Sequence, residues 1–301
     1  MRVIKRSGNT LFNILVLGTF FYLLYNPGLA SASITESIYI CVRQIVPALF
    51  IYMILARLLV GMPLTSLVFS KFGKYGTELE VLILGLLCGF PVGAKSAVYL
   101  YESGIIGKKR AEFICAFTNG ASVSFLLGYV GASIFSDINV GVRLVIFQLI
   151  ASIITAVILR ILYMSSSDFF AEKGRMIKKP TKTGLNEAVV DSTYTMISVC
   201  AFIITFFVFA ELVLAVTKAG GISGVLIRGF IEFSSGCVFA GSLEPKTAFI
   251  AISLFIGFSG LCVIMQIMSV IRGKLSSKMY LSGCFISTAV FGILSILFSI
   301  S

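Results

Sequence analysis

Apolar residues fill most of the chain in long stretches, and polar residues are gathered into short segments between them. Five stretches read as continuous helical spans: 11–25, 47–60, a stretch that ends near Val216, 141–164 and 279–300. About 20 apolar residues are enough for one helix to cross a bilayer. The pattern therefore predicts an all-α protein whose helices cross a membrane.

Four further apolar stretches are interrupted near their middle by small or polar residues. These stretches, with their interruptions in parentheses, are 79–101 (89–93), 108–135 (118–122), 222–243 (234–236) and 245–271 (257–260). Backbone groups cannot stay unpaired in hydrocarbon, so a broken helix survives only where protein shields it or where it lines a wet cavity. Paired interruptions are typical of transporter sites at the bilayer midplane. The alternative is helix kinking and close packing through small residues.

The two halves of the chain repeat one order of segments: a mixed polar and apolar lead-in, a span, two broken stretches and a span. Residues 34–45 and 186–195 are the lead-ins, and the first is expected to be amphipathic and interfacial, with Pro47 opening the following span. We therefore predict one transmembrane domain over 1–301, with a first repeat at 35–164, a cytoplasmic linker at 165–185 and a second repeat at 186–301. Faint matches align 81–85 with 225–229 and 117–122 with 254–259.

Composition and charge fit this pattern. Hydrophobic residues make up 58% of the chain and charged residues 12%, whereas a soluble domain is typically about 45–50% apolar and about 25% charged. Treating 79–101 and 222–243 as re-entrant hairpins places most of the 24 Lys and Arg residues on one side, as the positive-inside rule requires. That topology has seven spans and two hairpins, starts inside, and inverts the second repeat. The first apolar run resembles a signal peptide but is expected to stay as an uncleaved helix.

Missing residue types exclude several kinds of chemistry. The chain has no His, and none of its seven Cys residues forms a CxxC pair, so we expect no catalytic triad, no metal site and no cofactor. A lipid-acting enzyme is therefore disfavoured. The basic cluster at 173–182 is short and is expected to set topology rather than to bind nucleic acid.

The candidate site comprises the residues at the interruptions and the ionisable residues beside them. It contains Gly89, Pro91, Gly93, Lys95, Thr118, Asn119, Ser122, Glu232, Ser234, Ser235, Gly236 and Ser259. An ammonium group at the middle of the membrane costs about 2.5–3.5 kcal/mol unless it contacts an anion or water. Lys95 is therefore expected either to contact an anion or water at the site, or to snorkel toward the cytoplasmic side along Tyr99 and Tyr101. Glu232 is expected to carry a proton, ligate Na⁺ or pair with Lys95, whereas Glu211 and Arg228 are expected to form a structural pair.

Three stretches carry a resemblance to a known family: Gly89–Lys95 (GFPVGAK), Leu100–Ile106 (LYESGII) and Ala116–Gly120 (AFTNG). They resemble the YlbJ-like sporulation integral membrane proteins of the nucleoside-recognition (Gate) domain group, which is similar in layout to concentrative nucleoside transporters. The resemblance implies two hairpins and two unwound helices around a site, a spore-forming bacterial source, and movement of dipicolinate across a forespore membrane. Thr118–Gly120 departs from the Asn-rich turn expected there.

Together these observations predict a multi-pass transporter of the bacterial cell membrane that moves a small anionic metabolite by alternating access. The coupling ion, Na⁺ or H⁺, is left open, as is self-association into a homo-oligomer within the lipid. The alternatives are a nucleoside-type or ion-coupled solute transporter, and a non-transporting scaffold in spore-envelope assembly. A dry, tightly packed midplane would favour the scaffold.

Overall fold

The computed structural model describes residues 2–60, 68–69, 71–165, 168 and 184–299. These residues contain helices and no strand. The helices of the first half are α1 (Arg2–Tyr25), α2 (Pro27–Ile40), η1 (Cys41–Ile45), α3 (Val46–Leu59), η2 (Gly73–Tyr75), α5 (Gly76–Cys88), α6 (Val92–Glu102), α7 (Lys108–Phe117), η3 (Phe125–Ile134) and α8 (Ile138–Tyr163). Those of the second half are α10 (Leu185–Thr217), α11 (Gly221–Ile231), α12 (Phe233–Ala240), α13 (Pro245–Phe258), α14 (Gly260–Ile271) and α15 (Lys278–Leu297).

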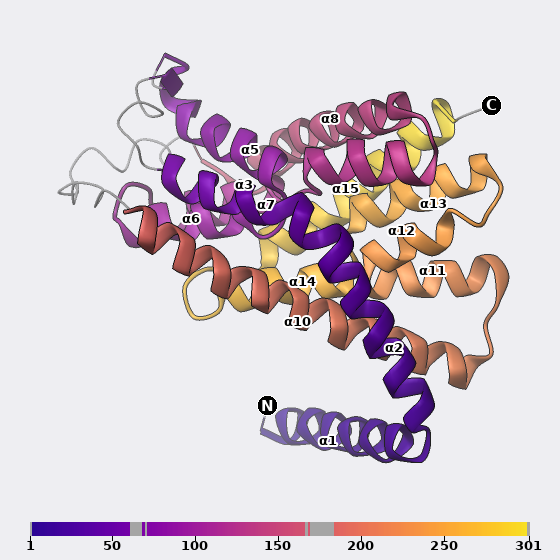
Figure 1. Cartoon of the computed structure of the whole chain (residues 1–301). Helices are drawn as coiled ribbons and strands as arrows, with labels where there is room; N and C mark the ends of the chain where they lie inside the picture. Colours follow the sequence, from indigo (N-terminus) through magenta and orange to yellow (C-terminus); the bar gives the residue numbers. More distant parts are fainter. Residues whose placement is uncertain (1, 61–67, 70, 166–167, 169–183, 300–301) are drawn as a thin grey trace.

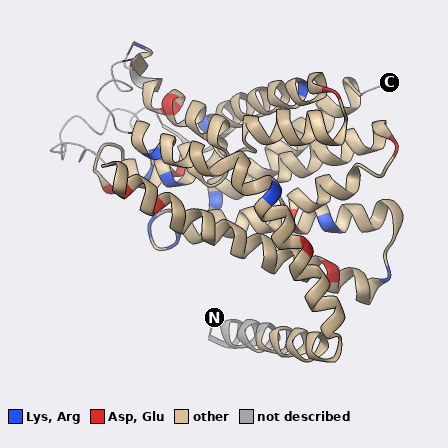
Figure 2. Cartoon of the chain, in the orientation of Figure 1, with Lys and Arg blue, Asp and Glu red and all other residues tan. Residues whose placement is uncertain are grey.

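The helices form a bundle that exposes many large apolar side chains on its surface. Five helical stretches are long and apolar enough to cross a membrane: Pro27–Leu59, Ile138–Tyr163, Leu185–Thr217, Pro245–Ile271 and Lys278–Leu297. Connections 103–107 and 272–277 lie at one end of the bundle, whereas 135–137, 218–220 and 241–244 lie at the other (Figure 1). We call the first the basic end, because Lys and Arg residues lie in or next to its connections in the sequence: Lys108, Lys109, Arg272, Lys274 and Lys278. Figure 2 shows the distribution of charged residues over the chain. The protein is a polytopic helical membrane protein, as the sequence predicts.

The expected start of a separate span at Pro47 is wrong. The structure has one helix from Pro27 to Leu59 that continues through Pro47. Proline in an α-helix lacks an N–H donor and its ring clashes with the carbonyl four residues earlier. Here the turn before Pro47 is the π-helical η1, whose wider ring of backbone atoms accommodates that carbonyl. The second lead-in is likewise continuous with its span in α10.

Two of the four broken stretches fold back as helical hairpins. Hairpin 1 consists of α5 and α6 and turns at 89–91; hairpin 2 consists of α11 and α12 and turns at Glu232. The predicted break at 234–236 is therefore displaced, because those residues form the first turn of α12. The other two stretches break as expected, at 118–122 between α7 and η3 and at Ser259 between α13 and α14.

Glycines bring each hairpin against the break of the following helix. A Cβ on Gly85 or Gly93 would lie 2.0 or 2.4 Å from the carbonyl oxygen of Thr118. In hairpin 2, a Cβ on Gly229 would lie 2.3 Å from the ring of Phe255. Gly85 aligns with Gly229 and Thr118 with Phe255 in the faint sequence match, so each aligned glycine packs against the aligned residue, through its backbone carbonyl in Thr118 and through its ring in Phe255.

The longer helices enclose the hairpins. The stretch from α2 to α3 packs along α10, and α8 packs along α15. Helix α6 of hairpin 1 also contacts α14, which brings the first hairpin against the second broken helix. The tips of both hairpins therefore lie inside the bundle, beside the breaks.

Candidate functional site

The tips of the two hairpins meet in the middle of the bundle. The rings of Phe90 and Phe125 lie 5.6 and 5.5 Å from the ring of Phe233, measured between centroids. Beside them is a central cavity of about 30 Å³, whose lining includes Ser122, Glu232 and Gln266. A space of this size holds about one or two water molecules. In this conformation the meeting point of the tips is therefore closed to a metabolite.

Glu232 lies at this meeting point with its side chain fully buried. One carboxylate oxygen accepts hydrogen bonds from the backbone N–H of Ser234 (3.1 Å) and from its hydroxyl (2.6 Å). The other oxygen accepts from the backbone N–H of Ser235 at 2.7 Å. Glu232 thus caps the N-terminus of α12, satisfies donors that the helix cannot pair by itself, and benefits from the positive end of the helix dipole.

Two larger hollows lead from the basic end toward this cavity. The outer one, which we call the vestibule, has a volume of about 350 Å³, and its lining includes Arg57, Lys95, Glu102, Asp191 and Lys274. The next, of about 190 Å³, shares Lys95, Thr195 and Val270 with the vestibule. It shares Val199 and Gln266 with the central cavity. The three hollows therefore adjoin in a row.

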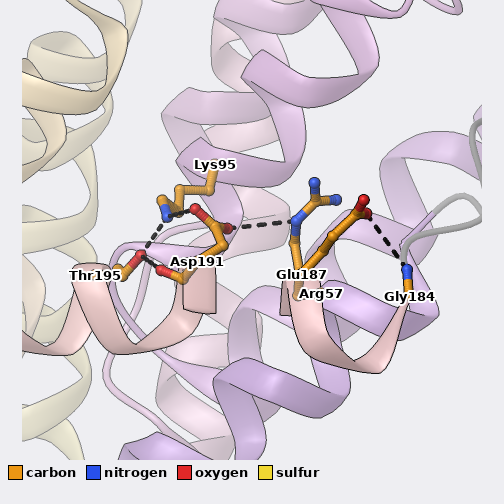
Figure 3. Close-up of polar contacts among 6 residues, drawn as sticks. All are labelled: Arg57, Lys95, Gly184, Glu187, Asp191 and Thr195. Carbon is orange, nitrogen blue, oxygen red and sulfur yellow. Dashed lines mark hydrogen bonds and ion pairs between the residues drawn. The ribbon is translucent and has the colours of Figure 1, made fainter. Parts of the chain in front are cut away.

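Charged side chains from three helices meet on the vestibule wall (Figure 3). One oxygen of Asp191 lies 3.1 Å from the Lys95 ammonium, and the other lies 3.3 Å from Nε of Arg57. Lys95 also donates to the hydroxyl of Thr195, which itself donates to the backbone carbonyl of Asp191 at 2.7 Å. The Arg57 guanidinium lies over the ring of Tyr99, 4.7 Å from its centroid. We call Arg57, Lys95, Asp191 and Thr195 the vestibule cluster.

The expected alternative in which Glu232 pairs with Lys95 is not what the structure shows. Lys95 follows the tip of hairpin 1 and points into the vestibule, where its side chain is about one-third exposed. Glu232 lies at the tip of hairpin 2 and its oxygens are taken by α12. Lys95 is therefore paired with Asp191, and Glu232 is hydrogen-bonded to the first turn of α12. Neither side chain contacts the other.

Polar residues at the first break hold backbone groups in place. The Asn119 amide accepts a hydrogen bond from the backbone N–H of Ala94 at 2.9 Å and donates to the carbonyl of Cys115 at 2.7 Å. The Ser122 hydroxyl accepts from the backbone N–H of Phe125 at 3.1 Å. Asn119 thereby ties the first turn of α6 to the break, and Ser122 supports the start of η3.

The remaining candidate residues fall in separate places. Pro91 lines the middle hollow with Lys95. Ser234, Ser235 and Gly236 are buried in α12, and Gly89 and Gly93 are packed against the first break. Ser259, in the left-handed backbone region, lines a different crevice of about 20 Å³, together with Asn119 and Tyr280. The structure therefore brings only Ser122 and Glu232 of the candidate residues to the lining of the central cavity.

Several residues at the site were missed by the sequence interpretation. Two of them, Arg57 and Asp191, belong to the vestibule cluster. A third, Gln148, binds the first break: its side chain accepts a hydrogen bond from the N–H of Ala121 at 2.9 Å and donates one to the Ala121 carbonyl at 2.8 Å. An ionisable residue within an apolar helix marks a functional position by itself. That rule, applied to every span, would have singled out Arg57 and Asp191.

Two other ion pairs have a different character. Arg228 and Glu211 form the expected pair, with two contacts of 2.7 and 3.0 Å. Arg110 and Glu78 form another, with contacts of 2.6 and 2.9 Å, and both residues are buried. Each joins two helices through both carboxylate oxygens. These pairs are structural, whereas the vestibule cluster faces a cavity.

Comparison with known proteins gives one match. The chain is similar to the "Sporulation integral membrane protein YlbJ" of Bacillus subtilis (strain 168), with 25% identity over an alignment of 272 residues that covers 75% of this chain. The match spans 66% of that protein's length. No family model matches the chain, and no solved structure matches it. The similarity and the apolar helices together support a YlbJ-like integral membrane protein.

Proposed function

We propose that this protein is a transporter that moves a small anionic metabolite across a bacterial membrane by alternating access. The observation that carries the proposal is the row of three adjoining hollows, which runs from the basic end to the buried meeting point of the two hairpin tips. A series of hollows that ends at a closed centre is the arrangement expected of a transporter open to one side.

The charges of the vestibule support an anionic substrate. Arg57, Lys95 and Lys274 face two carboxylates there, those of Asp191 and Glu102. A cleft with an excess of positive charge and low-dielectric walls raises the local concentration of anions. Arg57 and Lys95 together supply several donors for carboxylate oxygens.

The lengths of the hairpin helices support re-entrant segments. Helix α11 has 11 residues and α5 has 13, which correspond to about 16 and 20 Å of helix, against about 30 Å of hydrocarbon. Their tips therefore turn back within the membrane. With them the topology has seven spans, and the aligned contacts of Gly85 with Thr118 and of Gly229 with Phe255 support an inverted repeat.

The substrate and coupling ion are finer parts of the proposal. The related protein is named for sporulation, which makes dipicolinate the first substrate to test and a forespore membrane the first location. Glu232 is the candidate for H⁺ or Na⁺ coupling, because it is the buried carboxylate at the meeting point of the tips. Self-association in the lipid belongs to the same proposal.

Uptake into proteoliposomes tests the proposal. We expect protein-dependent accumulation of labelled dipicolinate or another small dicarboxylate, which Lys95→Ala reduces and Glu232→Gln abolishes or uncouples from an ion gradient. Glu211→Gln, a change in a structural ion pair, is the matched control. If the protein inserts correctly and moves none of the anions, nucleosides or ions offered, the transport proposal is wrong and a scaffold role is favoured.

A further inference from the structure

We propose that Arg57 and Lys95 form a carboxylate-binding site that Asp191 fills from within the chain, and that a dicarboxylate binds by taking the place of the Asp191 side chain. The inference rests on the proposed function for its substrate class, but it concerns binding and is tested without transport.

The two cations are held in position by contacts other than those with Asp191. Tyr99 lies under the guanidinium of Arg57, and the Thr195 hydroxyl accepts a hydrogen bond from Lys95. The cations come from α3 and α6, whereas Asp191 comes from α10. If the carboxylate swings away, the two cations remain near each other with their charges uncompensated.

Asp191 has room to leave and an anion has room to arrive. Its side chain is 45% exposed, and it lies on the wall of a cavity of about 350 Å³. Sites for small molecules have volumes of about 300–1,000 Å³. The carboxylate of Glu211 is only 18% exposed and makes two contacts with one arginine, so it has no comparable freedom.

The donors of the site are not used up by one carboxylate. Arg57 contacts Asp191 through Nε, and its buried Nη1 has no hydrogen-bond partner among the described residues. A buried donor without an acceptor is costly, so a ligand oxygen that reaches Nη1 after the Asp191 side chain has moved away gains affinity. A bound molecule with two carboxylates therefore fits better than the single side chain of Asp191, and better than a monocarboxylate.

An internal competitor raises the apparent Kd of the ligand, because only the fraction of protein with an empty site can bind it. If Asp191 fills it for about nine-tenths of the time, its removal lowers the apparent Kd about tenfold. Asp191→Asn is thus expected to tighten dicarboxylate binding. A purely structural ion pair predicts the opposite, because its loss would loosen the helices that hold Arg57 and Lys95.

Isothermal titration calorimetry on purified protein tests this, with pyridine-2,6-dicarboxylate and succinate as probes and benzoate as the monocarboxylate. We expect Asp191→Asn to lower the Kd of a dicarboxylate about tenfold, with little change for Glu211→Gln, a carboxylate loss from the same helix. Asp191→Glu keeps an internal carboxylate and is expected not to tighten binding. Arg57→Ala and Lys95→Ala are each expected to raise the Kd more than tenfold.

Equal or weaker binding by Asp191→Asn, or no dicarboxylate binding by any variant, would overturn the proposal. If Asp191→Asn proves unstable, Asp191→Glu keeps the proposal falsifiable: tighter dicarboxylate binding by this variant would overturn the proposal, and unchanged or weaker binding agrees with an internal competitor. Tight binding by Asp191→Asn in a protein that accumulates nothing in vesicles would contradict transport and leave this site intact.

Discussion

The two hairpins use one packing arrangement for opposite chemistry. Each brings a short helix pair against a broken helix through glycines, Gly85 and Gly93 in hairpin 1 and Gly229 and Gly236 in hairpin 2. Hairpin 1 places a cation, Lys95, on the wall of the open vestibule with a partner from another helix. Hairpin 2 places a carboxylate, Glu232, in the buried centre with partners from its own helix.

This difference separates what holds the fold from what meets a ligand. The groups around Glu232 are buried and satisfied within hairpin 2, so a change there acts first on stability. The groups around Lys95 face a cavity and are partly exposed, so under the proposed function a change there acts first on binding. Substitutions in the two hairpins should therefore have effects of different kinds and different sizes.

The largest effect on stability is expected from a methyl group between hairpin 1 and the first break. Gly85→Ala would place Cβ 2.0 Å from the backbone carbonyl of Thr118, which cannot move without disturbing the break. Overpacking of this kind costs about 3 kcal/mol. Gly229→Ala meets the ring of Phe255 instead, and because a ring can tilt, its cost should be smaller.

Unfolding in mixed SDS–detergent micelles measures both changes. Gly128→Ala is the control, because a Cβ there meets nothing within 4 Å. Equal stability of Gly85→Ala and Gly128→Ala would mean that hairpin 1 does not seat against Thr118 as described.

The next effect in size is expected at the tip of hairpin 2. Glu232→Ala removes the acceptor of two backbone N–H groups of α12, and the loss of an N-cap costs about 0.5–2 kcal/mol. Glu232→Gln keeps the size and one acceptor, so it should lose less. The same unfolding measurement compares the two. A variant more stable than the wild type would show that burial of the charge outweighs its capping role.

The smallest stability effect is expected at Lys95. Its side chain is about one-third exposed, and Arg57 still holds Asp191 when Lys95 is removed. Half-exposed ion pairs contribute about 0–1 kcal/mol, so Lys95→Ala should unfold within about 1 kcal/mol of the wild type. A loss as large as that of Glu232→Ala would remove the contrast between the hairpins.

The sequence predicts the breaks more reliably than it predicts their partners. Gly, Pro, Ser and Asn mark backbone that leaves the helix, and the structure breaks at or within a few residues of all four marked positions. The helix that continues through Pro47 was missed, because the wider turn of η1 has no signature in residue types. The residues around a helix end indicate where the helix begins or ends. They do not indicate which distant residues its side chains contact.

The partner of Lys95 illustrates the second difficulty. Asp191 is 96 residues away, and only the packing of α10 beside α3 and α14 brings it near. Glu232 seemed a fitting partner because both charges follow a hairpin turn. Capping by Glu232 was equally hard to predict, because the usual N-cap residues are Ser, Thr, Asp and Asn, and Glu is not among them.

Under the proposed function, the hollows form one side of a path through the membrane rather than a blind pocket. Ser198 lines the middle hollow, so Ser198→Cys reports on access to it. Labelling with a membrane-impermeant thiol reagent, applied from either side of oriented vesicles, measures that access directly, and the parent protein controls for its own cysteines. We predict labelling from the basic end without ligand and new labelling from the opposite side when a dicarboxylate is present. Labelling from the basic end alone, with and without the dicarboxylate, would contradict the account.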